Sequence, residues 1–441
     1  MRKMKDSRIE WIGEIPESWN TIRVKHLATE KDTLFLDGDW INSDVIVDEG
    51  IRYLTSGNAG EGFYKEQGKG YILEETFKKL NCLKVYPGDL MISRLNEPVG
   101  RCCIVPEGED YYVVAVDNVI LRPNEDISKK FMMYCMNTSG YARAALMAAS
   151  GTTMQRISRT SLGNMTVPVT DYDEQVRITN YLDQKCAEID AIIEAKEKTN
   201  ELLKERRQSI IYEAVTKGLD PTVPMKDSGI EWIGEIPENA QIIRLKYLCK
   251  IFGRIGFRGY TQADLVSEGE GPITLSPSNI TEIGMDYSKC TYLTWEKYDE
   301  SPEIQIHNND ILLVKTGSSY GKSAIVTDLP MEATINPQFV VIKEIVCNPK
   351  FLYYVMQTKM FEYQVEQAVV GGTIPTMAQE KINNFCITLP SVTECEKIVD
   401  YLDAKCTEFD ILISANNSTI AKLKEYRQSV IYEAVTGKVE I

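Results

Sequence analysis

Two short motifs in the second half of the chain come closest to patterns that perform chemistry. Thr316–Ser323 (TGSSYGKS) resembles the loop with which nucleotide hydrolases hold phosphates, a motif that requires Gly, four residues and then Gly-Lys-Ser or Gly-Lys-Thr. Thr316 occupies the place of the first Gly, and the residues after the loop predict a strand instead of a helix whose N-terminus would face a phosphate. We therefore do not expect nucleotide binding.

The segment Asn336–Phe339 (NPQF) is similar to the loop with which adenine methyltransferases hold an extruded base, but it has one Pro where that loop has two. No Gly-rich strand-to-helix turn for a methyl donor precedes it, so the start of a strand is the expected role. The two histidines, His26 and His307, are far apart in the sequence. Neither catalytic residues nor a metal site is expected in this chain.

Two long segments organise the sequence. Asp171–Thr216 contains no Pro or Gly, and Glu394–Thr436 repeats it at an offset of 220 residues, with RQSIIYEAVT in the first copy and RQSVIYEAVT in the second. Apolar residues recur in both at seven-residue spacings, which is typical of the seam of a coiled coil. The polar residues Asn200 and Asn416 interrupt this seam, and such positions fix the register of a coiled coil.

The sequence therefore predicts two long helices that pack on each other. The alternative is two independent amphipathic helices, each lying on its own domain. The predicted seam residues are Leu182, Ile189, Ile193, Leu203, Ile210, Leu402, Phe409, Ile413, Leu423 and Val430.

A second repeat precedes each long segment. Met4–Glu17 recurs as Met225–Glu238 with thirteen of fourteen residues identical, and Gly88–Val105 corresponds to Asn309–Val326, both predicted as strand, polar loop and strand. The blocks between these repeats have diverged, which suggests two related modules that bind different things. We predict an α+β fold in which two pseudo-symmetric domains, 1–170 and 218–391, are separated by two long helices, 171–217 and 392–437, packed as an antiparallel coiled coil.

Composition limits the classes of function. The eleven Cys form no CxxC pair and no apolar stretch marks the N-terminus, so we expect reduced thiols in the cytoplasm, and no run of eighteen apolar residues predicts a membrane span. The net charge is −15, and neither large block is basic: residues 1–150 carry 19 basic and 23 acidic side chains. Taken alone, this charge argues against a nucleic-acid binder unless a local patch or a basic partner supplies the attraction.

Taken together, the motifs resemble the specificity subunit of type I restriction-modification enzymes. The resemblance rests on MKDSGIEWIGEIPE, the loop KTGSSYGKSAIV, the GTT loop before the first long helix and the paired helices with RQSIIYEAVTKGL, and it covers essentially the whole chain. It implies that 1–170 and 218–391 are target-recognition domains, each reading one half of a split double-stranded DNA sequence. It also implies that the helices space the two domains.

The resemblance further implies partner subunits that carry the chemistry. These are two modification (methyltransferase) subunits, which would bind S-adenosylmethionine, and two restriction subunits, which would use ATP and Mg to translocate and cut DNA. This chain would then hold no cofactor. Two alternatives stay open: a stand-alone DNA methyltransferase with degenerate motifs, and a coiled-coil scaffold without DNA contact.

If the domains read DNA, the candidate contacts lie in the polar loops, where side chains can leave a rigid scaffold and reach a groove. Their donors are of the types that pair with base edges or phosphates, and the alternative for each is a solvated side chain or a turn former. The candidates are Asn58, Arg94, Asn96, Arg101, Thr152, Thr153, Gln155 and Arg156 in the first domain, and Asn279, Lys315, Ser318, Ser319, Lys322, Thr373 and Thr376 in the second.

Overall fold

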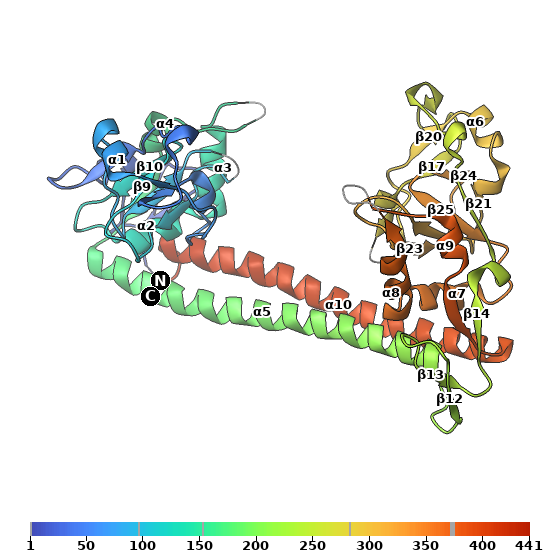
Figure 1. Ribbon diagram of the computed structural model, residues 1–441. Helices are drawn as coiled ribbons and strands as arrows, with labels where there is room; N and C mark the ends of the chain where they lie inside the picture. The colour runs from blue at the N-terminus through green and yellow to red at the C-terminus, as the bar shows by residue number, and fades with distance from the viewer. Residues whose placement is uncertain (1, 96–97, 152–153, 282–283, 371–374) are drawn as a thin grey trace. The chain divides into compact units, whose positions relative to one another are not determined.

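The two copies of the repeat fold into two units of the same design. The computed structural model describes residues 2–95, 98–151, 154–281, 284–370 and 375–441. The chain divides by its internal contacts into unit 1, residues 1–197 and 417–441, and unit 2, residues 198–416 (Figure 1). Each unit therefore contains one sheet-rich body together with part of each long helix.

Unit 1 is built on a four-stranded antiparallel sheet of order β4-β10-β7-β8 and a three-stranded sheet of order β6-β5-β9, in which β5 and β9 are parallel. Its strands are β1 (Met4–Asp6), β2 (Glu14–Pro16), β3 (Asn20–Arg23), β4 (Leu34–Asp37), β5 (Ile51–Leu54), β6 (Tyr71–Ile72), β7 (Leu90–Ser93), β8 (Cys102–Ile104), β9 (Val113–Val114), β10 (Asn118–Arg122) and β11 (Thr166–Val169). Its helices are η1 (Val24–His26), η2 (Ser43–Val45), η3 (Ser56–Asn58), α1 (Glu74–Leu80), α2 (Lys129–Met136), α3 (Ser139–Met147) and α4 (Arg159–Asn164).

Unit 2 repeats this plan with a four-stranded sheet of order β15-β25-β22-β23 and a five-stranded sheet of order β16-β20-β17-β24-β21. Its strands are β12 (Met225–Asp227), β13 (Glu235–Pro237), β14 (Gln241–Arg244), β15 (Lys250–Gly253), β16 (Leu265–Val266), β17 (Ile273–Leu275), β18 (Ile280–Thr281), β19 (Gly284–Met285), β20 (Thr291–Leu293), β21 (Gln305–Ile306), β22 (Ile311–Val314), β23 (Ser323–Ile325), β24 (Ala333–Ile335), β25 (Phe339–Lys343), β26 (Val369–Val370), β27 (Thr376–Met377) and β28 (Cys386–Leu389). Its helices are η4 (Leu245–Tyr247), η5 (Gly256–Arg258), η6 (Gln262–Asp264), η7 (Pro277–Asn279), α6 (Trp295–Asp299), η8 (Pro302–Ile304), α7 (Pro349–Met356), α8 (Lys359–Ala368) and α9 (Gln379–Asn383).

Each unit contains one pair of parallel strands, at corresponding places in the fold. β5 pairs with β9 in parallel in unit 1, and β17 pairs with β24 in parallel in unit 2, although every other ladder is antiparallel among the strands that the structure describes. The central sheets also have the same order, and buried Val, Ile and Leu side chains fill both faces of their inner strands. The predicted α+β class with pseudo-symmetric domains is therefore confirmed.

The long helices are α5 (Tyr172–Lys217) and α10 (Val392–Val435). Asp171 caps α5 by accepting a hydrogen bond from the Glu174 backbone N–H at 2.9 Å, and Gly218 follows the helix with a φ of +76°, which a Gly adopts without steric cost. The Ser391 hydroxyl accepts the backbone N–H of Glu394 at the start of α10. Local capping residues thus set these helix ends.

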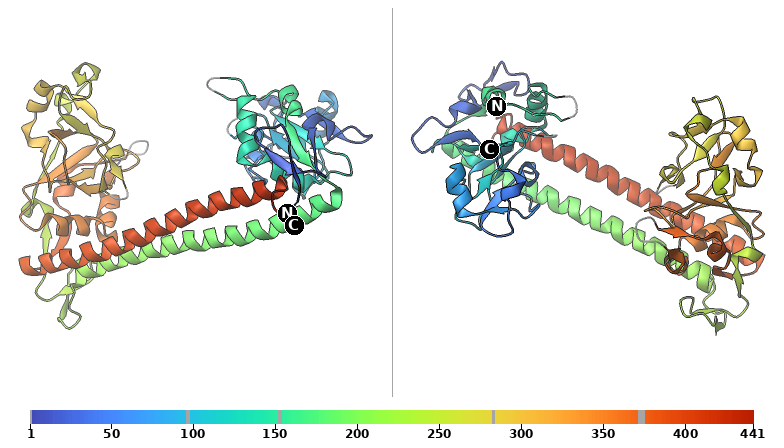
Figure 2. Two further views of the ribbon diagram at one scale, coloured as in Figure 1. Left: turned by 180° about the vertical axis from the view of Figure 1, so that it is seen from behind. Right: turned by 45° about the horizontal axis from the view of Figure 1, so that its top comes forward.

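Within each unit, the two helix segments pack antiparallel (Figures 1 and 2). In unit 1, Asp190 pairs with Arg427 and Glu197 with Lys424, so the partner number falls as the α5 number rises. In unit 2, Asn200 pairs with Asn416 and Arg207 with Asp410 in the same sense. The predicted packing of the helices is confirmed, and the alternative of independent helices is wrong.

The predicted seam residues are all at least partly shielded from solvent. Leu182, Ile189, Ile193, Leu402 and Val430 are buried, and Leu203, Ile210, Phe409, Ile413 and Leu423 are half-buried. In unit 1, Ile189 and Ile193 of α5 form a small cluster with Ile420 and Leu423 of α10.

The same polar anchor joins each sheet-rich body to its long helix. In unit 1, Asp183 of α5 accepts hydrogen bonds from Lys130 Nζ at 2.6 Å and from the Tyr134 hydroxyl at 2.8 Å. In unit 2, Asp403 of α10 accepts the equivalent bonds from Lys350 and Tyr354 at 2.5 and 2.6 Å. Both anchors stand where the sequence repeat places them, 220 residues apart.

Candidate nucleic-acid interface

Three polar loops meet beside the central sheet of unit 1. They are the β7–β8 loop, which begins at Arg94 and ends at Arg101, the η3 turn, and the segment from Gln155 to Arg159, the first residue of α4. A backbone bridge between Leu95 and Arg156 joins the first loop to the third, and hydrogen bonds from Arg101 join it to the η3 turn. The sheet thus holds most of the described candidate residues of this domain close together.

Arg101 points into the fold. Its guanidinium donates to the backbone carbonyls of Ala59 at 2.7 Å, Ser56 at 2.8 Å, Leu95 at 3.0 Å and Pro98 at 3.2 Å. Its side chain is buried, and this burial lowers its pKa. Arg101 therefore holds two loops together, and we remove it from the predicted DNA contacts because its donors are already engaged.

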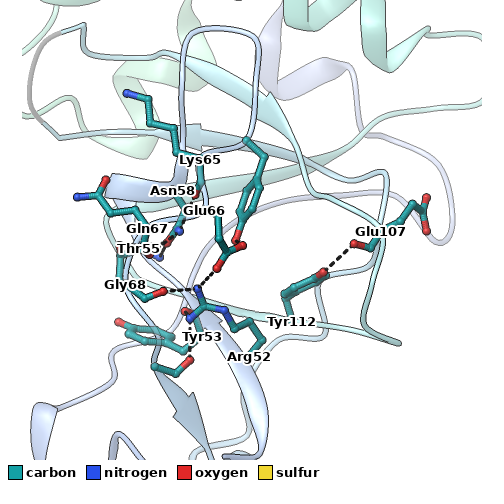
Figure 3. Close-up of polar contacts among 12 residues, drawn as sticks. Arg52, Tyr53, Thr55, Asn58, Lys65, Glu66, Gln67, Gly68, Glu107 and Tyr112 are labelled. Carbon is teal, nitrogen blue, oxygen red and sulfur yellow. Dashed lines mark hydrogen bonds and ion pairs between the residues drawn. The ribbon is translucent and has the colours of Figure 1, made fainter. Parts of the chain in front are cut away.

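Asn58 is also a structural residue (Figure 3). It is 1% exposed, its Oδ1 accepts the Thr55 backbone N–H at 2.8 Å, and its Nδ2 donates to the carbonyls of Lys65 and Gln67 at 2.9 and 2.8 Å. Asn279 of unit 2 repeats this arrangement: it accepts the Ser276 backbone N–H and donates to the carbonyls of Asp286 and Lys289. The predicted adenine contacts of these two residues are thus revised, since a base edge cannot reach satisfied, buried amides.

The exposed cations of unit 1 surround two carboxylates. Buried Arg94 lies 3.2 Å from Asp37 and donates to the Val116 carbonyl, so it is also largely engaged, and burial lowers its pKa. Arg156 pairs with Asp117 at 2.8 Å and Arg159 lies 3.5 Å from Asp37, yet both side chains stay more than 40% exposed. Because they are exposed, Arg156 and Arg159 remain accessible to a phosphate. The cluster as a whole has three cations and two anions, which also favours an anion. Gln155, beside them, is half-buried.

Unit 2 joins the corresponding loops with different side chains. The Thr316 and Thr376 hydroxyls form a hydrogen bond at 2.7 Å, and Gly317 donates its backbone N–H to the Pro375 carbonyl at 3.0 Å. Thr376 therefore stands where unit 1 has Arg156, because Thr376 pairs with Thr316 and Arg156 with Leu95, each the second residue after β22 or β7. Lys315 is half-buried, and burial lowers its pKa.

The remaining candidates of unit 2 face solvent. Ser318 and Lys322 are exposed and line a hollow of about 620 Å³ between the β22–β23 loop, β18 and α8, and Ser319 beside them is half-buried. Lys322 corresponds to Arg101, but it points outward. The two units therefore present different donors on equivalent loops.

Four candidates, Asn96, Thr152, Thr153 and Thr373, lie outside the described residues. Sequence reasoning missed Arg52, which is 5% exposed and holds the segment from Tyr64 to Gly70, and Arg159. The Arg-x-x-Arg spacing of Arg156 and Arg159 was a usable signal. Arg52 had no comparable signal in the sequence, because the segment that it holds, Tyr64–Gly70, lies in a block that has diverged between the two copies.

The described part of the chain shows no group of three or more His, Cys, Asp or Glu side chains arranged to hold a metal ion. Over the same residues, no helix is both long and apolar enough to cross a bilayer. All eleven cysteines are free thiols.

Comparison with known proteins agrees with this architecture. Residues 237–425 match the family model described as "Type I restriction modification DNA specificity domain". The chain is 20% identical to the type I restriction enzyme MjaVIII specificity subunit of Methanocaldococcus jannaschii, covering 97% of this chain and 94% of that protein. It is 21% identical to the EcoBI specificity subunit of Escherichia coli, covering 99% and 90%.

Solved structures share the fold. A chain from work on complex assembly and conformational transition of the type I R-M system superposes with a TM-score of 0.71 at 14% identity, covering 96% of this chain and 99% of that one. The HsdS subunit from Thermoanaerobacter tengcongensis superposes with a TM-score of 0.50 at 15% identity, covering 96% and 98%. The chain is thus similar over nearly its whole length to type I restriction enzyme specificity subunits, and residues 237–425 match the DNA specificity domain of that family.

Proposed function

We propose that the two sheet-rich bodies, 1–170 and 218–391, each read one half of a bipartite double-stranded DNA target. The observation that carries this proposal is the duplicated loop arrangement with unlike side chains. The exposed Arg156 of unit 1 corresponds to Thr376 of unit 2, and the inward-facing Arg101 corresponds to the exposed Lys322. A shared scaffold with different donors is what reading two different half-sites requires.

The proposed DNA contacts fall into two groups according to how exposed their side chains are. Arg156 and Arg159 in unit 1, and Ser318 and Lys322 in unit 2, would bind phosphates or base edges, because their donors reach the surface. Gln155, Ser319 and Thr376 are half-buried and would contribute less. The proposal keeps Lys315 as a phosphate contact, since a partly buried ammonium gains from an anion.

In this proposal, the long helices set the spacing of the half-sites and offer binding surfaces to two modification and two restriction subunits. S-adenosylmethionine would bind in the modification subunits, and ATP and Mg in the restriction subunits, so this chain would carry no cofactor. The match of residues 237–425 to the specificity-domain model and the similarity to specificity subunits support this division. The free thiols support a cytoplasmic place of action.

The proposal is tested by co-expressing the chain with a modification subunit of its system and mapping methylated adenines in the host DNA. We expect one split motif, with two defined half-sites and a gap of fixed length. A contiguous motif, or methylation without sequence preference, would overturn the proposal. Purified chain incubated with labelled S-adenosylmethionine should transfer no methyl groups; transfer would favour the stand-alone methyltransferase.

A further inference from the structure

The segment from Tyr64 to Gly70 in unit 1 is fixed by buried polar side chains (Figure 3). The Arg52 guanidinium donates to the carbonyls of Gly68 at 2.6 Å and Gly70 at 3.0 Å, and pairs with Glu66 at 2.9 Å. The Tyr64 hydroxyl donates to the other Glu66 oxygen at 2.9 Å. Asn58 holds the same segment from its other side, through the carbonyls of Lys65 and Gln67.

Such an arrangement is costly in free energy and therefore points to a function. Burying a guanidinium and an amide is unfavourable, and only complete hydrogen bonding offsets it. Here the hydrogen bonds go to an exposed segment and not to the hydrophobic core. The result is a rigid segment on the surface, which is the property that a recognition element needs.

The direction of the side chains alternates along this segment. Glu66 pairs with Arg52 while its side chain stays largely exposed, whereas Lys65 and Gln67 extend away from that guanidinium and are also exposed (Figure 3). Neither side chain packs in the core, so their positions depend on the backbone that Arg52 and Asn58 hold. Both carry donors suited to base edges: an amide can pair with adenine and an ammonium with guanine.

Unit 2 holds an equivalent segment through Asn279, the counterpart of Asn58. Asn279 donates to the carbonyls of Asp286 and Lys289 at 2.9 and 3.0 Å, and the Tyr287 hydroxyl donates to the Thr327 carbonyl at 2.9 Å. Ser288 and Lys289 are exposed. The same positioning device therefore occurs in both units, in stretches whose sequences have diverged.

We propose that the pinned segments, Tyr64–Gly70 and Asp286–Cys290, read bases, with Lys65 and Gln67 contacting one half-site and Lys289 the other. Arg52, Asn58 and Asn279 are positioning residues. This inference rests on the proposed function and deepens it by naming the specificity-determining side chains.

The test uses the full chain co-expressed with its modification subunit. Methylation is measured at the wild-type target and at targets carrying single base changes in either half. Gln67→Ala and Lys65→Ala should reduce discrimination roughly tenfold at one or two positions of a single half-site, the range expected for loss of a base contact. Lys289→Ala should act on the other half-site. The matched control is Lys79→Ala on α1, an exposed Lys of unit 1 outside the segment, which should change nothing.

A positioning role is tested with Asn58→Asp, which keeps the acceptor but turns the donor into an oxygen facing two carbonyls. It should relax the same half-site as Gln67→Ala while the other half-site stays fully discriminated, which a general loss of folding cannot produce. If that variant fails to fold, Arg52→Lys takes its place. Unchanged discrimination in Gln67→Ala, Lys65→Ala and Lys289→Ala, within a complex that still methylates a split target, would overturn this inference and leave the proposed function standing.

Discussion

The side-chain amide of Asn416 donates a hydrogen bond to Oδ1 of Asn200 at 2.9 Å across the helix pair of unit 2. Asn200 is buried, and both residues occupy seam positions that apolar residues fill elsewhere. Polar pairs of this kind lower stability but specify register, because any shift leaves a buried amide unpaired.

Asn200→Ala should therefore destabilise the helix pair by about 0.5–1.5 kcal/mol, the net contribution of the hydrogen bond that it removes. The double variant Asn200→Leu/Asn416→Leu should recover most or all of this loss, since apolar packing replaces the polar pair. Urea-induced unfolding measures both, with the exposed neighbour Glu201→Ala as control. A double variant less stable than the single one would contradict this explanation.

Because of the anchors at Asp183 and Asp403, we expect the stability of the protein to depend on pH in the alkaline range. Burial and then the hydrogen bond to Asp183 raise the pKa of Tyr134, and burial and Asp403 raise that of Tyr354 in the same way. The unfolded chain releases these protons near pH 10, whereas the folded chain keeps them. The folded state then binds more protons, so the free energy of unfolding falls as pH rises above about 10.

Tyr134→Phe and Tyr354→Phe should each make this fall less steep, because each removes one group whose pKa rises on folding. The free energy of unfolding measured between about pH 9 and 12 checks it. Variants that keep the wild-type slope would show that the anchors do not form.

Arg101→Lys should destabilise unit 1 by about 1–3 kcal/mol, because an ammonium cannot satisfy the four carbonyls that the guanidinium reaches. The matched change at the equivalent position, Lys322→Arg, should shift stability by less than about 0.5 kcal/mol, since Lys322 is exposed. Chemical denaturation of both variants tests whether the Arg101 side chain points into the fold. Equal changes in the free energy of unfolding for the two variants would contradict an inward-pointing Arg101.

The isolated chain should bind DNA weakly. Its net charge is −15, and buried or paired contacts already engage Arg52, Arg94 and Arg101. Acidic side chains outnumber basic ones by 64 to 49. We therefore expect a Kd above about 1 µM in physiological salt and much tighter binding once the modification subunits are present. A gel-shift titration showing nanomolar binding by the chain alone would contradict this expectation.

Much of the fold followed from the sequence because its signals are local. The seven-residue spacing of Leu182, Ile189 and Leu203 identified the helices, and Asp171 and Gly218 cap and end the first of them. The repeat of the opening motif identified the duplication.

The site was predictable only as a set of loops. Arg94 and Arg101 have the side chains of DNA contacts, but in the fold they lie close to backbone carbonyls and turn inward to them. Asn58 and Asn279 were predicted as DNA contacts, although the Thr55–Asn58 and Ser276–Asn279 spacings, present in both copies, are typical of local capping. Lys65, Gln67 and Lys289 lie in diverged blocks, where no repeat marks them.

The most direct test of the central claim is to replace residues 1–170 with the corresponding domain of a relative of known target and to map methylated adenines again. The account predicts that one half-site changes to that of the donor, while the second half-site stays as in the wild type. An unchanged target, as a scaffold without DNA contact would give, or a change in both half-sites, would contradict it.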